Sequence, residues 1–124
     1  MKKESLLELL DTSRTIRGHT CPAIKYQTVG HHTYRTLVIL YWLYAPSYPP
    51  ANLVYALLVH DMPEVYTGDM PGDIKAKNGD IAAGMNSLEH EFHNRVGLGP
   101  VNLTEEEKLI LEMCDRADLF FWGY

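Results

Sequence analysis

The sequence has few cysteines, no long apolar run and no surplus of basic residues. Its two cysteines, Cys21 and Cys114, are too few for a disulfide framework or a paired-cysteine zinc site, so we expect a reducing, cytoplasmic setting. The 11 Lys and Arg against 16 Asp and Glu give a formal net charge of -5, which argues against nucleic acid as a partner. The longest apolar run, residues 37–45, is about half as long as a membrane span requires, so no membrane association is expected.

The composition is that of an ordinary globular protein. Of the 124 residues, 46% are hydrophobic and 22% are charged, which disfavours disorder. The length predicts a single domain over residues 1–124. A chain of this size buries roughly two-thirds of its unfolded surface, enough for a core without disulfide support.

Turn-forming residues divide the chain into segments with helical patterns. We expect helices over residues 4–14, 31–45, 51–66 and 80–96, and a last helix that begins at Thr104. Thr104 and Glu107 form a capping box, and Asn78 precedes the fourth segment as a capping residue. Pro63 is expected to bend or close its helix. Residues 31–45 would also suit a strand, but the segment is long and has no second strand to pair with. The prediction is an all-α bundle of five to six helices.

Several of these helices carry a histidine or a carboxylate on an apolar face. His60 and Asp61 are adjacent after an apolar segment, although a lone histidine there is as often a satisfied core residue. His32 opens a second apolar helix, and Asp115 and Asp118 lie within a third. A carboxylate on such a face is costly unless it is paired or binds a metal. A cation shared by the three segments would satisfy them all, and nitrogen with carboxylate ligands suits Zn, Mn, Fe, Co or Ni.

Four motifs in a fixed order extend this pattern over most of the chain. They are "TIRG" at residues 15–18, "VGHHT" at 29–33, "HDMPEVYTGDMP" at 60–71 and "EKLILEMCD" at 107–115. With them the chain resembles the HD-domain metal-dependent phosphohydrolases. It looks most like the bacterial 5′-deoxynucleotidases and the related small phage deoxynucleoside triphosphohydrolases, including the dATP-removing type. The resemblance runs from Arg17 to Asp118 and implies an HD-domain helical bundle.

The resemblance implies a divalent transition metal, with a possible second Mg²⁺ for a polyphosphate substrate. The family's metal ligands correspond to His32, His60, Asp61 and Asp115. His31 is not expected to be a ligand, because adjacent helical residues point about 100° apart. Asp118 is the alternative to Asp115, since the two are three residues apart on one helical face.

The resemblance also implies how a phosphoester would be cleaved. Arg17 corresponds to the arginine that contacts phosphate and stabilises charge in the transition state. Glu64 corresponds to the catalytic glutamate, which would relay a proton to or from water and the leaving oxygen. The implied reaction is hydrolysis of the 5′-phosphoester of deoxynucleotides, with monophosphates and triphosphates both open.

The implied substrate contacts extend beyond the metal ligands. Asp69 matches the aspartate that touches the sugar 3′-hydroxyl, and Lys75 matches a lysine near the phosphate, with Lys77 as a further candidate. Gly18 stands where the deoxynucleotidases have a tryptophan that contacts the nucleoside, so the base pocket must be built differently. The full expected set of substrate-binding residues is Arg17, Gly18, His32, Asp61, Asp69 and Lys75.

Other readings and features remain. The same metal core could hydrolyse a cyclic dinucleotide or a ppGpp-like ester, or the chain could be a catalytically silent nucleotide-binding module.

The segment "EHEFH" at residues 89–93 lacks the HExxH spacing and predicts a solvated face. Cys114 is expected to pack in the core. Core or subunit contact is expected for an aromatic group, and the apolar C-terminus "FFWGY" favours a homo-oligomer, a dimer or larger; the aromatic group comprises Tyr41, Trp42, Tyr44 and Tyr48.

Overall fold

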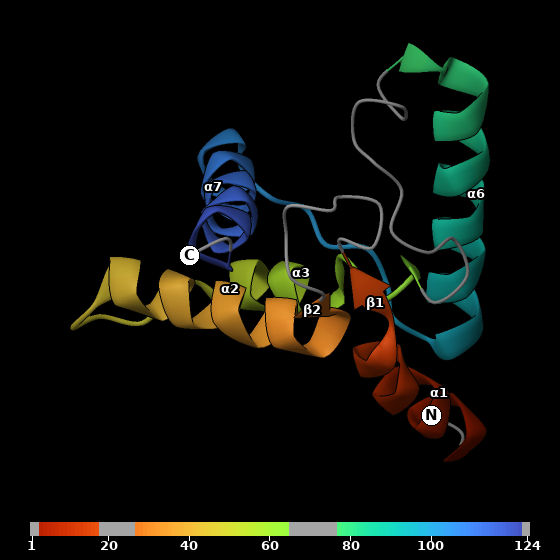
Figure 1. The fold of residues 1–124 in the computed structure, drawn as a ribbon, viewed down its shortest axis with the longest axis horizontal. Helices are drawn as coiled ribbons and strands as arrows, with labels where there is room; N and C mark the ends of the chain where they lie inside the picture. The colour runs from red at the N-terminus through yellow and green to blue at the C-terminus, as the bar shows by residue number, and fades with distance from the viewer. Residues whose placement is uncertain (1–2, 18–26, 65–76, 123–124) are drawn as a thin grey trace.

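The computed structural model describes residues 3–17, 27–64 and 77–122, and over these ranges the protein is all-α, as predicted (Figure 1). No helix in these ranges is both long and apolar enough to cross a membrane. The helices, in chain order, are α1 (Lys3–Asp11), the short 3-10 helix η1 (Thr12–Arg14), α2 (Val29–Tyr44), α3 (Ala51–Val59), α6 (Gly79–Val96) and α7 (Glu105–Trp122).

The capping signals read from the sequence are confirmed at the starts of α6 and α7. Asn78 is the N-cap of α6, and its side chain accepts hydrogen bonds from the backbone N–H groups of Asp80 and Ile81. Before α7, the Glu107 carboxylate accepts from the Thr104 N–H at 2.9 Å, while the Thr104 hydroxyl accepts from the Glu107 N–H at 3.1 Å. Each pair satisfies backbone donors that the first helical turn leaves without an intrahelical partner.

The third helix is shorter than predicted. The expected helix over 51–66 ends at Val59, and single turns follow, with Met62 N–H donating to the Val59 carbonyl and Glu64 N–H to the Asp61 carbonyl. Pro63 explains the correction, because it has no N–H to donate and its ring disfavours the helical conformation of the preceding residue. His60 and Glu64 therefore do not share one face of a continuous α-helix.

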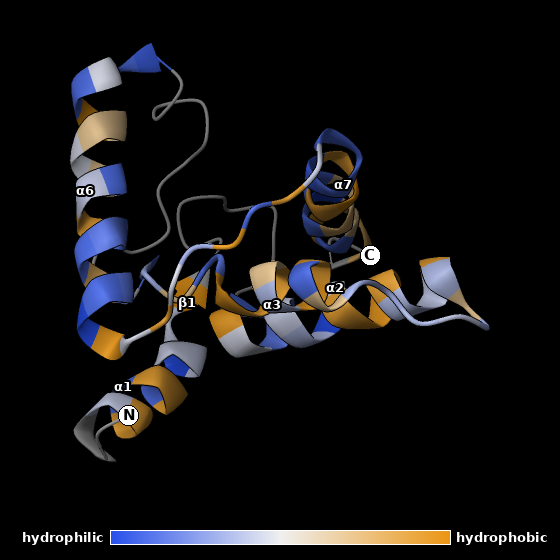
Figure 2. Cartoon of the chain, turned by 180° about the vertical axis from the view of Figure 1, so that it is seen from behind, coloured by the Kyte–Doolittle hydropathy of each residue, from blue (hydrophilic) through white to orange (hydrophobic). Residues whose placement is uncertain are grey.

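The core lies where α2, α3 and α7 meet. Its buried centre consists of Leu40 from α2, Leu53 and Leu57 from α3, and Cys114 from α7. The expectation that Cys114 packs in the core is thus confirmed. These three helices carry broad hydrophobic bands, whereas α6 is mainly hydrophilic or neutral (Figure 2). The core fixes the crossing of α2 and α7, from which the site below is built.

A short ribbon that the sequence did not predict precedes α2. Strand β1 (Ile16–Arg17) pairs antiparallel with β2 (Gln27–Thr28), so the backbone of Arg17 lies opposite that of Gln27. The first turn of α2 then passes very close to η1. A Cβ on Gly30 would lie 2.8 Å from the Cβ of Ser13, nearer than such atoms approach, so only glycine fits there.

Helix α6 stands beside the three-helix core and is tied to α1 (Figure 1). Arg95 in its last turn donates through both terminal nitrogens to the Glu8 carboxylate of α1. Gly97 ends α6 in the left-handed conformation, with φ of 79°, and its N–H donates to the His93 carbonyl. A left-handed residue at this place is the common way to end a helix.

An apolar face of α2 and α7 is open to solvent. Trp42 is 74% exposed and Phe120 is 61% exposed, and a groove of about 430 Å³ runs between the two helices. The sequence analysis expected core or subunit contact for four aromatic residues. Tyr44 packs against the core, whereas Tyr41, Trp42 and Tyr48 are exposed, so subunit contact stays a prediction for these three. We call the exposed set the outer apolar face; it comprises Val38, Tyr41, Trp42, Leu43, Met113, Phe120 and Phe121.

Candidate metal centre

Four side chains from three separate segments converge on one point. His32 lies in the first turns of α2, His60 and Asp61 follow the end of α3, and Asp115 lies in α7. Each offers one nitrogen or oxygen atom, and these four atoms all lie within 4.8 Å of one another. The structure thus brings together the four residues to which the sequence analysis assigned the metal.

The centre is buried on one side and reaches solvent on the other. The His32 side chain is fully buried and that of Asp61 is 13% exposed, whereas His60 is 21% and Asp115 35% exposed. The core contact between α2 and α7 shields the His32 side. Among the four side chains, those of His60 and Asp115 are therefore the most accessible to solvent.

Both histidines are anchored through one ring nitrogen and present the other. His60 Nδ1 lies 2.8 Å from the Leu57 carbonyl, so it carries the proton and donates. His32 Nδ1 lies 2.7 Å from a carboxylate oxygen of Asp118, which likewise accepts. In a neutral imidazole, each Nε2 then carries the lone pair. These Nε2 atoms point to the cluster, 2.5 Å and 3.2 Å from Asp115 Oδ1.

The charges of the cluster shift its pKa values in opposite directions. Burial opposes ionisation of Asp115, but the hydrogen bonds and charges of His32 and His60 outweigh it and hold the pKa of that carboxyl far below its usual range. Burial alone would lower the pKa of His60, but the hydrogen bond to Asp115 and the negative charges of Asp61 and Asp115 raise it above 6.5. In the metal-free cluster, the deprotonated form of Asp115 and the protonated form of His60 are thus favoured.

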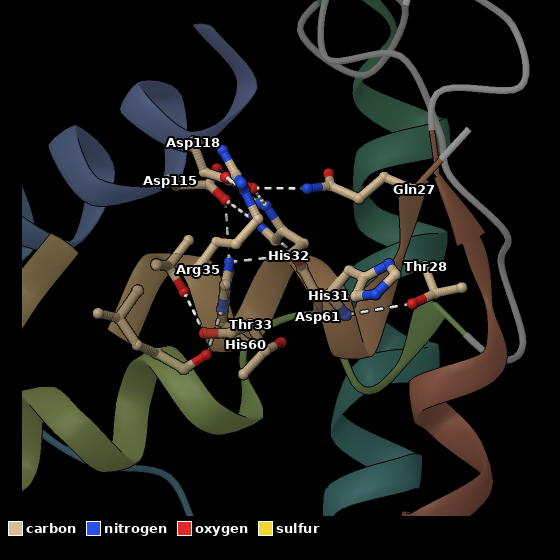
Figure 3. A network of polar contacts seen from close by, with 12 residues as sticks. Gln27, Thr28, His31, His32, Thr33, Arg35, His60, Asp61, Asp115 and Asp118 are labelled. Carbon is tan, nitrogen blue, oxygen red and sulfur yellow. Dashed lines mark hydrogen bonds and ion pairs between the residues drawn. The ribbon is translucent and has the colours of Figure 1, made fainter. Parts of the chain in front are cut away.

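Asp118, the alternative ligand, lies behind the cluster rather than in it (Figure 3). Its carboxylate accepts from Gln27 Nε2 at 2.8 Å, from His32 Nδ1 at 2.7 Å and from Arg35 Nε. Gln27 and Arg35 were not identified from the sequence. A local signal existed for Arg35, which follows His32 by three residues as Asp118 follows Asp115. Gln27 had none, because 91 residues separate it from Asp118.

The two expected catalytic residues are connected to the cluster through backbone contacts of neighbouring residues. Glu64 is one turn past Asp61, its N–H donating to the Asp61 carbonyl at 3.1 Å, and its Oε2 atom is buried. The backbone of Arg17 on β1 lies opposite Gln27, whose side chain contacts Asp118. The short ribbon therefore connects the Arg17 segment to the back of the cluster.

The remaining expectations fall into two groups. Gly18, Asp69 and Lys75 lie outside the described residues. His31 is exposed, and the Thr28 hydroxyl accepts its backbone N–H, so it stays outside the cluster as expected.

The segment at residues 89–93 contributes to no metal cluster within the described ranges. His90 and Glu91 are exposed, in agreement with a solvated face. His93 departs from it, because its Nε2 is buried with no hydrogen-bond partner among the described residues. Phe92 beside it is fully buried, so one edge of this helix faces inward.

The donor set of the cluster fits a divalent transition ion. Two imidazole nitrogens and two carboxylate oxygens form a mixed N/O set, which borderline ions such as Zn, Mn, Fe and Co accept. The residues behind it also fit, because metal-binding histidines typically donate their second ring N–H to a carboxylate or a carbonyl. Here His32 has the former and His60 the latter.

Comparison with known proteins agrees with this geometry. A family model described as 5'-deoxynucleotidase YfbR-like matches residues 19–118, while no curated protein and no solved structure gives a match. The matched range begins just after Arg17 and Gly18 and includes all four residues of the cluster. Since the match spans most of the 124 residues, the chain belongs to the YfbR-like 5'-deoxynucleotidase family.

Proposed function

We propose that the protein is a metal-dependent hydrolase that cleaves the 5′-phosphoester of deoxynucleotides, releasing the deoxynucleoside and phosphate or triphosphate. The observation that carries the proposal is the convergence of His32, His60, Asp61 and Asp115 within 4.8 Å. Three segments of the chain bring polar side chains, whose burial is unfavourable without a partner, to one point where α2, α3 and α7 meet. Membership of the family supports deoxynucleotides as the substrate class.

A divalent cation held by these four side chains would supply an acidified water and a positive charge beside the phosphorus atom. The chain's own residues supply the rest. His32 and His60 present Nε2 because their Nδ1 atoms are anchored, and Asp61 and Asp115 contribute oxygen. The carboxylates also make the pocket electronegative, so a phosphate needs a positive partner there.

Glu64 and Arg17 complete the proposed machinery. Glu64, one turn beyond Asp61, takes the proton from the attacking water and returns it to the leaving 5′-oxygen. Arg17 contacts the phosphate oxygens and balances the charge that builds up in the transition state. We assign Asp69 to the 3′-hydroxyl of the sugar and Lys75 to the phosphate, and Gly18 replaces the tryptophan of the similar deoxynucleotidases.

We also propose that the protein forms a homo-oligomer through the outer apolar face of α2 and α7. Soluble monomers rarely expose contiguous apolar patches of more than a few hundred Å². The groove between the helices is lined by Val38, Trp42, Met113 and Phe121 among others, and we propose that apolar side chains of a second copy fill it.

Product analysis on all four deoxynucleoside monophosphates and triphosphates tests the activity. Each is incubated with the purified protein and Co²⁺, Mn²⁺ or Zn²⁺, with the matching ribonucleotides, a cyclic dinucleotide and ppGpp as comparison substrates. Release of deoxynucleoside with phosphate or triphosphate supports the proposal. Turnover of the comparison substrates alone would assign a different phosphoester, and binding without turnover would leave a nucleotide-binding module.

A further inference from the structure

A fully buried carboxylate lies directly behind the cluster, and no role has yet been assigned to it. The Asp118 side chain has no exposure to solvent. Donors from two other elements converge on it, namely Gln27 from β2 and His32 and Arg35 from α2 (Figure 3). A buried charge with this many partners is costly to build and specific in its geometry, so it calls for a reason.

Both oxygens of Asp118 already accept hydrogen bonds, and the only cluster member among the donors, His32, donates through the ring nitrogen that points away from the cluster. Oδ1 accepts from Arg35, while Oδ2 accepts from Gln27 at 2.8 Å and from His32 Nδ1 at 2.7 Å. Asp115 differs, because its Oδ1 faces the Nε2 atoms of both histidines. The two acids lie three residues apart on α7 but serve opposite nitrogens of one imidazole ring.

The two histidines of the cluster are therefore held unequally. His60 donates its Nδ1–H to the neutral carbonyl of Leu57, whereas His32 donates to the Asp118 carboxylate, which also pairs with the Arg35 guanidinium. A hydrogen bond to a charged acceptor is roughly twice as strong as one between neutral groups. It also raises the electron density at the opposite nitrogen, which strengthens the ring as a metal ligand.

Arg35 makes this arrangement possible in the protein interior. Its Nε pairs with Asp118, and its side chain is 35% exposed, so it connects the buried acid to solvent. The guanidinium balances the acid's charge and occupies the oxygen that could otherwise turn towards the metal. The spacing of three residues repeats on both helices, since His32 and Arg35 on α2 face Asp115 and Asp118 on α7.

We infer that Asp118, held by Arg35, is a positioning residue that fixes the His32 ring with Nε2 towards the metal and makes His32 the stronger of the two imidazole ligands. The inference rests on the proposed metal centre. Asp118 contacts neither metal nor substrate and acts only through His32.

A measurement on the unmodified protein tests the ring assignment. In the Zn²⁺-loaded protein, long-range ¹H–¹⁵N NMR of the imidazoles is expected to show the His32 proton on Nδ1. A proton on Nε2 of His32 would overturn the inference. The measurement uses the wild-type protein, so it does not depend on the folding of a variant.

Variants separate positioning from simple burial of charge. Asp118→Asn is expected to bind Co²⁺ about 10- to 100-fold more weakly than the wild type, as removal of such outer partners typically does, with chelator competition as the readout. An exposed acid of the same helix gives the matched control, Glu112→Gln, which is expected to keep wild-type affinity.

The double variant Asp118→Asn/Arg35→Met removes the buried acid and its partly exposed guanidinium partner together. We expect it to melt closer to the wild type than Asp118→Asn alone but to keep the weak Co²⁺ affinity. Recovery of affinity along with stability would make Asp118 a structural acid only and refute the inference, as would wild-type affinity in Asp118→Asn. Failure of the wild type itself to bind Co²⁺ would instead refute the metal centre.

Discussion

Binding of a divalent metal is expected to raise the melting temperature of the protein. The four ligands come from segments far apart in the chain, since His32 and Asp115 are separated by 83 positions. Their ligand atoms lie within 4.8 Å only when α2, α3 and α7 are packed. A cation that needs all four therefore binds the folded chain and not the unfolded one, and it stabilises the folded state by mass action.

The size of the effect follows from the affinity and the chain length. At a free metal concentration 100 times the Kd, the gain is about 2.7 kcal/mol. A chain of 124 residues has an unfolding entropy of about 0.26 kcal/mol per kelvin near its melting temperature. The ratio predicts a rise of about 10 °C.

Thermal unfolding followed by circular dichroism, with and without Co²⁺, measures the shift. Asp61→Ala removes one of the four ligands and is expected to abolish the rise. The control is Asp11→Ala, which removes an exposed carboxylate whose partner Arg14 is also exposed, and it should keep the full rise. Each protein is compared with its own metal-free form, so the intrinsic effect of the substitution cancels.

Two outcomes would contradict this reasoning. An unchanged melting temperature at saturating Co²⁺ in the wild type would mean that the four side chains do not hold the ion together. An equal rise in Asp61→Ala would place the ion elsewhere on the protein.

The other predictions concern catalysis, pH, the core and assembly. Glu64→Gln is expected to keep the metal-induced rise but to lose about 100-fold or more in kcat; a wild-type rate would remove its role as proton carrier. The pKa of His60 is raised in the metal-free protein, so the contribution of its protonated form to stability is full below pH 6.5 and is lost as pH rises through the raised pKa. Metal must displace that proton, so the metal-induced rise in melting temperature should grow with pH above 6.5. A metal-induced rise that shrinks over this range would contradict the prediction. Leu57→Ala, at a fully buried core position, should cost about 2–5 kcal/mol in urea unfolding, and a loss below 1 kcal/mol would mean that the core is elsewhere. Trp42→Glu on the outer apolar face should convert the oligomer to a monomer in light scattering, whereas a monomeric wild type would remove the proposed interface.

Local signals in the sequence account for much of the fold. Thr104 with Glu107, and Asn78, start α7 and α6 as expected, because capping depends on residues a few positions apart. The end of α3 was misplaced at residue 66, since the apolar pattern continues past Val59 while Pro63 ends the helix earlier. The ribbon of β1 and β2 was missed because two-residue strands have no periodicity to detect.

The candidate site could be predicted where a polar side chain lies on an apolar helix face, because its burial there is costly without a partner. Histidines and acids on apolar faces, such as His32 and Asp115, stand out because burial without a partner is unfavourable. The distinction between Asp115 and Asp118 required the structure, because both lie on one face of α7 and differ in which nitrogen of His32 they meet. Gln27 could not be found, since only the folded chain places β2 beside α7.

The crossing of α2 and α7 supports the core, the cluster and the outer apolar face at once. A substitution that rotates or separates these two helices would therefore change the stability of the core and the geometry of the cluster together. Selection for greater stability would then be limited by selection for activity. Helix α6, which the Arg95–Glu8 ion pair connects to α1, carries none of the four cluster residues and is therefore not under this constraint. Engineering for greater robustness has most freedom there, while adjustment of turnover belongs at the crossing.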